Sequence, residues 1–126
     1  MENFALTFPK DSPKNLDRIA SRTGGKIQVL SVSDITHFFA QDKLTFAQTA
    51  ENKHFPIDFS LGELEEKLPK KTFLRVHRSS LVNLDFIEEV HGWFSGKVLI
   101  RLKDRKKTEI VVARDRVKIL KEFLGM

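Results

Sequence analysis

Short runs rich in apolar, β-branched and aromatic residues recur along most of the chain, and turn-forming residues separate them. Several runs alternate with a period of two, the pattern of a strand that buries one face. Residues 35–41 and 44–49 flank Asp42-Lys43, which predicts a hairpin closed by a two-residue turn. Further strands are expected at residues 54–58, 73–77, 97–102 and 109–112, and a strand or bent strand broken by Gly92 at residues 86–94. The pattern therefore predicts a mainly β fold of short antiparallel strands.

The segment before residue 31 has two interpretations. Ser12-Pro13 is a typical helix start, and apolar residues follow it at helical spacing. Alternatively, residues 18–22 and 26–30 are strands joined by a turn at Gly24-Gly25. We favour the hairpin, because the glycine pair lies between two alternating runs.

Two other segments carry helical signals. Ser60 followed by Glu63 is a capping box, and Pro69 ends the run that it begins. One face of this helix is apolar, and its outer face is expected to lie in water and to carry Glu65, Glu66 and Lys67. A second short helix is predicted over residues 114–124, with Gly125 at its C-terminus.

Length and composition limit the protein class. A chain of 126 residues suits one domain, expected at residues 17–126, after a tail or linker remnant at residues 1–16. The absence of cysteine excludes disulfides, thiolate metal sites and thiol catalysis. No apolar run approaches the length of a membrane span, and the N-terminus does not resemble a signal peptide. We expect a cytoplasmic protein with no membrane partner.

The positive charge is concentrated in the second half of the chain. Residues 1–69 carry eight Lys and Arg against ten Asp and Glu, whereas residues 70–121 carry fourteen against six. Such asymmetry favours a polyanionic partner, although a basic protein without such a partner would show it too.

The stretch Phe73–Asn83, FLRVHRSSLVN, places a polar cluster between apolar anchors. If Leu74 and Val76 point inward, alternation turns Arg75 and His77 outward. Arg78, Ser79 and Ser80 then lie at the strand's end. Their donors are of the types that bind phosphate oxygens and the acceptor edge of guanine. The alternative is an ordinary strand and turn with His77 satisfied in the core.

Polar residues gather at two more places. The hairpin tip offers Gln41, Asp42 and Lys43, which a plain solvated turn would also explain. Arg114 and Arg116 lie in the first turn of the last helix, where the helix dipole disfavours cations. An anionic partner nearby would account for that placement. His91 and Trp93, in contrast, are interpreted as structural.

Motifs for catalysis, metals and cofactors are absent from the sequence. There is no glycine-rich phosphate loop and no His/Asp/Glu spacing typical of a metal site. His77 and Ser79 share a face in a strand, but no oxyanion motif accompanies them. We therefore expect neither an enzyme nor a cofactor.

The chain resembles the LytTR family, the DNA-binding output domain of many bacterial response regulators of the LytR/AlgR type. The resemblance covers about residues 17–124, and its most specific part is Phe73–Ser79 followed by Leu81-Val82-Asn83. The remaining residues that carry it are Ser33-Asp34-Ile35, Phe38-Phe39-Ala40, Ser60-Leu61, Leu64-Glu65, Leu68-Pro69, Val112 and Arg114.

The resemblance implies small antiparallel sheets whose loops, in place of a recognition helix, enter the major groove. Family contacts correspond to the 41–43 loop, to Arg78 with Ser79 near phosphates, and to Arg114. With the donors beside them, the expected DNA-binding residues are Gln41, Asp42, Lys43, Arg75, His77, Arg78, Ser79, Arg114 and Arg116. Two departures are Ala113, where many members have serine, and Leu44, where many have an aromatic residue, a change expected to alter the packing behind the 41–43 loop.

We expect a module that binds double-stranded DNA in a sequence-specific manner and regulates transcription in a bacterial two-component system. The resemblance implies a receiver or sensor domain that this chain does not include. It also implies a monomer or weak dimer in isolation, and a dimer on paired DNA sites. The alternative is a basic protein-interaction module that binds an acidic partner.

Overall fold

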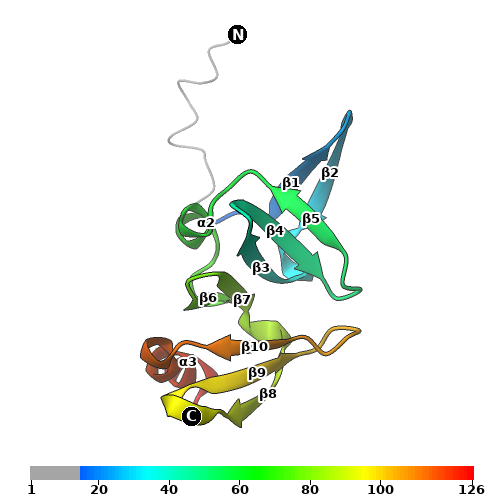
Figure 1. The fold of residues 1–126 in the computed structure, drawn as a ribbon. Helices are drawn as coiled ribbons and strands as arrows, with labels where there is room; N and C mark the ends of the chain where they lie inside the picture. Colours follow the sequence, from blue (N-terminus) through cyan, green and yellow to red (C-terminus); the bar gives the residue numbers. More distant parts are fainter. Residues whose placement is uncertain (1–14) are drawn as a thin grey trace.

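Three small antiparallel sheets form most of the computed structural model, which describes residues 15–126 (Figure 1). A two-stranded sheet pairs β1 (Arg18–Thr23) with β2 (Lys26–Ser31). The five-stranded sheet has the order β5 (His54–Ile57), β4 (Leu44–Thr49), β3 (Ile35–Gln41), β7 (Ser80–Asn83) and β6 (Phe73–His77). The three-stranded sheet has the order β10 (Glu109–Val112), β9 (Val98–Leu102) and β8 (Ile87–Gly92). With helices α2 (Leu61–Lys67) and α3 (Val117–Leu124), this confirms the predicted mainly β fold with two short helices.

The five-stranded sheet is the middle layer between two hydrophobic clusters. One cluster joins it to α2 and to the β1–β2 hairpin, and the other joins β6 and β7 to the three-stranded sheet and α3. Strand β6 contributes to both, because Phe73 is buried in the first cluster and Leu74 and Val76 in the second. The expectation that Arg75 simply points outward is therefore wrong. The face opposite Val76 is covered by α2, and Arg75 lies against that helix.

The two interpretations of the N-terminal segment are resolved for the residues that the structure describes. Arg18–Thr23 pairs with Lys26–Ser31 around Gly24, whose φ of +59° suits a residue without a side chain. The hairpin is thus confirmed. The predicted tail at residues 1–16 and the alternative helix start at Ser12-Pro13 fall almost wholly on residues 1–14, outside the described part.

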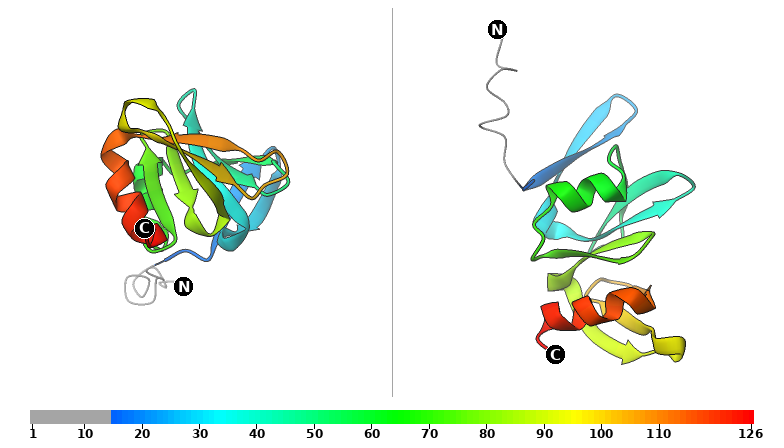
Figure 2. Two further views of the ribbon diagram at one scale, coloured as in Figure 1. Left: turned by 90° about the horizontal axis from the view of Figure 1, so that it is seen from below. Right: turned by 90° about the vertical axis from the view of Figure 1, so that its left-hand side faces the viewer.

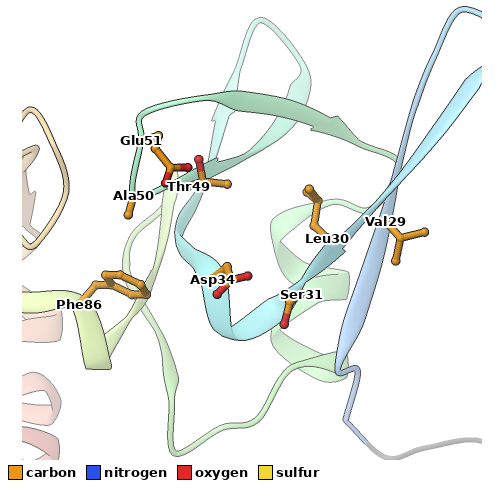
Figure 3. Close-up of a pocket in the computed structure, with 8 residues that line it drawn as sticks. All are labelled: Val29, Leu30, Ser31, Asp34, Thr49, Ala50, Glu51 and Phe86. Carbon is orange, nitrogen blue, oxygen red and sulfur yellow. The ribbon is translucent and has the colours of Figure 1, made fainter.

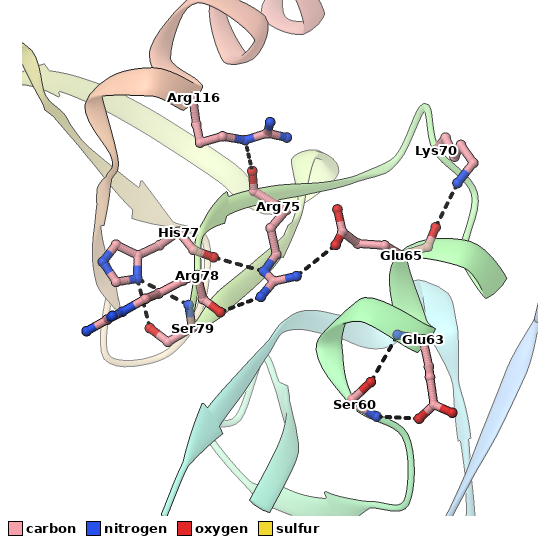
Figure 4. A network of polar contacts seen from close by, with 9 residues as sticks. All are labelled: Ser60, Glu63, Glu65, Lys70, Arg75, His77, Arg78, Ser79 and Arg116. Atoms are coloured by element: carbon pink, nitrogen blue, oxygen red, sulfur yellow. Dashed lines mark hydrogen bonds and ion pairs between the residues drawn. The ribbon is translucent and has the colours of Figure 1, made fainter. Parts of the chain in front are cut away.

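The capping box at the start of α2 is present in full. The Ser60 hydroxyl accepts a hydrogen bond from the Glu63 backbone N–H at 3.1 Å, and the Ser60 N–H donates to the Glu63 carboxylate at 2.9 Å (Figure 4). Leu61 and Leu64 then bury the inner face of the helix. Two N–H groups that the helix cannot satisfy itself are thereby paired.

Replacing Ser60 with alanine removes one of these bonds and leaves the Glu63 N–H without its protein acceptor. We expect the free energy of unfolding to fall by about 0.5–2 kcal/mol. Chemical denaturation of Ser60→Ala beside Ser33→Ala, a serine that caps no α-helix, measures this difference. Equal stability of the two variants would contradict a stabilising role for the cap.

The ends of two predicted elements differ from expectation. Residues Arg114–Arg116 form a 3-10 turn before α3, and Gly125 ends the helix with a φ of 77°. The strand predicted at residues 86–94 is shorter, because 3-10 turns occupy Leu84–Phe86 and Phe94–Gly96. Trp93 and His91, interpreted from the sequence as structural, both lie at the surface. Trp93 is 43% exposed, and the His91 Nε2 lies 2.8 Å from a Glu89 carboxylate oxygen.

The basic loop between β9 and β10 is fixed to the rest of the protein at its base. Asp104 is buried and accepts hydrogen bonds from Asn52 and Gln48 at 2.8 and 3.1 Å. The Arg105 N–H also donates to the Ala50 carbonyl, so this loop lies beside the β4–β5 connection. Burial alone raises the pKa of Asp104, but hydrogen bonds from Thr108 and Asn52 outweigh it and lower that pKa.

Within residues 15–126, no helix has the length and apolar character needed to cross a membrane.

Candidate nucleic-acid interface

Backbone hydrogen bonds bring three segments that are far apart in the sequence to one side of the molecule. The Ala40 N–H, near the tip of the β3–β4 hairpin, donates to the Ser79 carbonyl at 3.0 Å. The Ala113 N–H, just before the last helix, donates to the Val76 carbonyl at 2.9 Å. The right-hand view of Figure 2 shows the hairpin tip, the β6–β7 turn and the start of the last helix all pointing to the same side.

The hairpin tip holds two consecutive side-chain-bearing residues in left-handed backbone conformation. Asp42 has a φ of 54° and Lys43 a φ of 67°, as a type I′ turn requires. Gln41, Asp42 and Lys43 are all exposed. Glycine or asparagine would suit these positions better, and such local strain is commonly found at functional sites. Leu44, directly after the tip, is 56% exposed.

Arg75 stabilises the turn that presents Arg78. Its Nε donates to the His77 carbonyl at 3.0 Å, and one terminal nitrogen donates to the Arg78 carbonyl. The other terminal nitrogen forms an ion pair with the Glu65 carboxylate on α2 at 2.7 Å. Figure 4 shows this guanidinium at the centre of the network, whereas the Arg78 side chain extends away from it. The sequence predicted that Glu65 would lie in water, but its carboxylate pairs with Arg75.

His77 and Ser79 close the same turn from the other side. The His77 Nδ1 accepts a hydrogen bond from the Ser79 backbone N–H at 3.2 Å and lies 2.9 Å from the Ser79 hydroxyl oxygen. Both side chains are half-buried. The pair thus fixes the backbone on either side of Arg78.

The two arginines before α3 have different surroundings. The Arg116 Nε donates to the Arg75 carbonyl at 2.7 Å, and its side chain is half-buried. Arg114 is exposed, and its side chain crosses Gly96, where a Cβ atom would come within 2.9 Å of the Arg114 Cδ. Gly96 also has a φ of +75°, so only glycine fits this position without strain. Ala113, at the position where many family members have serine, forms no side-chain cap for this turn.

The predicted contact residues thus fall into two groups. Exposed side chains that reach the common side of the molecule are Gln41, Asp42, Lys43, Arg78 and Arg114. Half-buried side chains with partners inside the protein are Arg75, His77, Ser79 and Arg116. Sequence reasoning missed the roles of Glu65, which pairs with Arg75, and of Gly96, which packs against Arg114. No sequence pattern near either residue indicates these contacts, because the partners are distant in the chain and meet only in the folded protein.

Other parts of the surface suit an anion less well. Figure 3 shows a pocket lined by eight residues that include Asp34 and Glu51 and no Lys or Arg.

His37 is buried, and burial lowers its pKa to about 4, so it is neutral near pH 7. No group of His, Cys, Asp and Glu within residues 15–126 has the geometry to hold a metal ion.

Comparison with known proteins identifies similar sequences and a similar fold. Residues 25–125 match the family model described as the LytTr DNA-binding domain. The transcriptional regulatory protein YpdB of Escherichia coli K12 is 34% identical over 101 residues, which are 80% of this chain and 41% of YpdB. The sensory transduction protein LytT of Bacillus subtilis is 33% identical over 107 residues, 85% of this chain and 43% of LytT. The chain therefore spans about two fifths of the length of these relatives.

A solved structure supports the architecture. The LytTr DNA-binding domain of a putative methyl-accepting/DNA response regulator from Bacillus cereus superimposes with a TM-score of 0.79. The match covers 89% of this chain and the whole of that chain, at 23% sequence identity. At this identity the likeness shows the fold, three small sheets with two short helices.

Proposed function

The chain belongs to the LytTr DNA-binding domain family, and from this premise we propose that it binds double-stranded DNA in a sequence-specific manner to regulate transcription. The family is one of DNA-binding regulatory domains and not an enzyme family. Both relatives described above are named as regulatory or sensory proteins.

One observation carries the proposal at the level of residues. Three segments more than thirty residues apart in the chain meet on one side and expose Lys43, Arg78 and Arg114. Arginine reads guanine through two parallel hydrogen bonds to O6 and N7, and lysine reaches the same acceptors or a phosphate. Short loops on rigid sheets suit this task, because the sheets fix the spacing between the loops.

We assign different roles to the two groups of predicted contact residues. Arg78 and Arg114 read base edges in the major groove, and the 41–43 tip contacts the neighbouring bases. Arg75, His77, Ser79 and Arg116 act by holding the Arg78 turn, since each side chain already forms a hydrogen bond inside the protein. Arg116 and Ser79 also lie close enough to the exposed group to contact phosphates at the edge of the interface.

The domain works with partners outside this chain. Because the relatives are more than twice as long as the matched region, we propose that a receiver or sensor domain controls binding in a response regulator. The chain alone is a monomer or weak dimer, and two copies bind paired DNA sites. The site of action is the cytoplasm, where the DNA is.

The proposal is tested by selecting bound duplexes from a random pool and then measuring variants on the selected sequence. Lys43→Ala and Arg114→Ala should each weaken specific binding by roughly 1 kcal/mol while the melting temperature hardly changes. Lys106→Ala is the matched control, because Lys106 is also exposed but lies in the β9–β10 loop.

Two outcomes would contradict this assignment. If the duplexes selected from the pool share no common sequence, the proposal of sequence-specific binding is contradicted. Unfolding of the domain by Arg114→Ala would show that this guanidinium is a structural tie and not a contact to DNA.

A further inference from the structure

The loop between β8 and β9 exposes two aromatic side chains. Trp93 is 43% exposed and Phe94 is 71% exposed. Their rings stack on each other, with centroids 5.5 Å apart and planes 26° from parallel. Neither ring belongs to the hydrophobic clusters described above. Stability of the fold therefore does not explain why this loop carries them.

The backbone of the loop is built to present these rings. The Trp93 N–H donates to the Lys97 carbonyl at 3.1 Å, and the Lys97 N–H donates to the Phe94 carbonyl at 3.3 Å. Ser95 and Gly96 have φ values of 62° and 75°, which turn the chain sharply within the loop. Two successive left-handed residues make this a tight and ordered turn.

The aromatic loop is continuous with the candidate interface. Its Gly96 lies directly against the Arg114 side chain, at the distance given above. In the right-hand view of Figure 2 the loop, drawn in yellow, points to the same side as the hairpin tip, the β6–β7 turn and the start of the last helix. A duplex that reaches Arg114 therefore passes beside Trp93 and Phe94.

The chemistry of the loop suits a nucleic-acid backbone. Residues 92–98, GWFSGKV, contain no acidic residue, and Lys97 is exposed beside the rings. A deoxyribose presents an apolar C–H face next to each phosphate. Aromatic rings beside a lysine can cover that face while the ammonium group pairs with the phosphate.

We infer that Trp93 and Phe94 form an additional DNA-contact site, which packs against the sugars of the duplex that flanks the bases reached by Arg114. The inference rests on the proposed function and extends it. The contact adds affinity without reading sequence, because every nucleotide offers the same sugar. It lengthens the duplex that the domain covers beyond the bases read by the three loops.

Trp93 is the only tryptophan of the chain, so its emission reports directly on this site. We expect DNA binding to change the Trp93 emission and to protect the ring from quenching by acrylamide. Anisotropy of a labelled duplex, measured in the same titration, reports binding independently of the loop.

Variants test the contribution to affinity. Phe94→Ala should weaken binding about tenfold, as expected for loss of a buried aromatic contact, and by the same factor on selected and scrambled duplexes. Phe123→Ala is the matched control, because Phe123 is also exposed, at 42%, but lies on α3 near the C-terminus. Shortening the duplex from one of its two ends should abolish the difference between Phe94→Ala and the wild type.

The outcomes separate this inference from the proposed function. Absence of any anisotropy change would contradict both. A clear anisotropy change with unaltered Trp93 emission and quenching, and with Phe94→Ala indistinguishable from Phe123→Ala, would overturn the aromatic contact and leave the proposed function standing. Protection of Trp93 by an acidic protein but not by DNA would equally overturn it.

Discussion

Replacing Arg78 with alanine should lower affinity for the selected site by about 1–3 kcal/mol and affinity for random duplex much less. Arg78 is the exposed residue of the β6–β7 turn, and its backbone is held on both sides while its side chain extends outward. A fixed backbone and a directed guanidinium are what bidentate recognition of guanine needs, because both hydrogen bonds depend on one orientation.

The matched control is Arg105→Ala. Arg105 is an exposed arginine of the β9–β10 loop, so its removal changes the net charge equally. Binding of both variants to selected and random duplexes separates a base contact from a charge effect. Equal losses on the two kinds of DNA for Arg78→Ala would reduce Arg78 to a phosphate contact.

Removal of Arg75 should weaken specific binding nearly as much, although Arg78 itself is intact. Arg75→Ala leaves the His77 and Arg78 carbonyls without their donor and separates the turn from Glu65 on α2. We also expect the free energy of unfolding to fall by about 1–3 kcal/mol, since the lost bonds come from a charged donor that is largely buried. Lysine should not restore binding, because one ammonium group cannot reproduce the planar fork.

A double-mutant cycle distinguishes positioning from contact. If Arg75 acts through the turn, the combined loss in Arg75→Ala/Arg78→Ala is close to that of either single variant. Additive losses would show that Arg75 binds DNA by itself. Glu65→Gln should shift affinity in the same direction by less, and Glu66→Gln, on the exposed neighbour, should leave it unchanged.

Local signals in the sequence were sufficient for most of the fold. The 42–43 turn lies between two runs of strand formers, and the Ser60–Glu63 pair forms its capping box within one helical turn. Such features depend on residues close in the chain, so periodicity and capping rules can find them. The strand or bent strand predicted at residues 86–94, with a break at Gly92, corresponds to β8, which ends at Gly92 and is flanked by 3-10 turns.

The contacts that hold the candidate DNA-binding residues in place could not be predicted from local sequence patterns. Alternation correctly put Arg75 opposite Val76, but it does not show that α2 covers that face of β6. The ion pair with Glu65 and the packing of Arg114 on Gly96 depend on how separate elements meet. Trp93 was interpreted as structural, yet it is 43% exposed and belongs to neither hydrophobic cluster.

The central claim is sequence-specific binding of double-stranded DNA, and affinity measured across a salt series for a selected and a scrambled duplex tests it most directly. With three to six phosphate contacts, log affinity should fall against log salt with a slope of roughly −3 to −5. Sequence-specific binding predicts two separated curves, with the selected duplex bound more tightly at every salt concentration because base contacts persist when phosphate contacts are screened. Curves that coincide throughout would contradict it and would leave a basic surface that binds polyanions by charge alone.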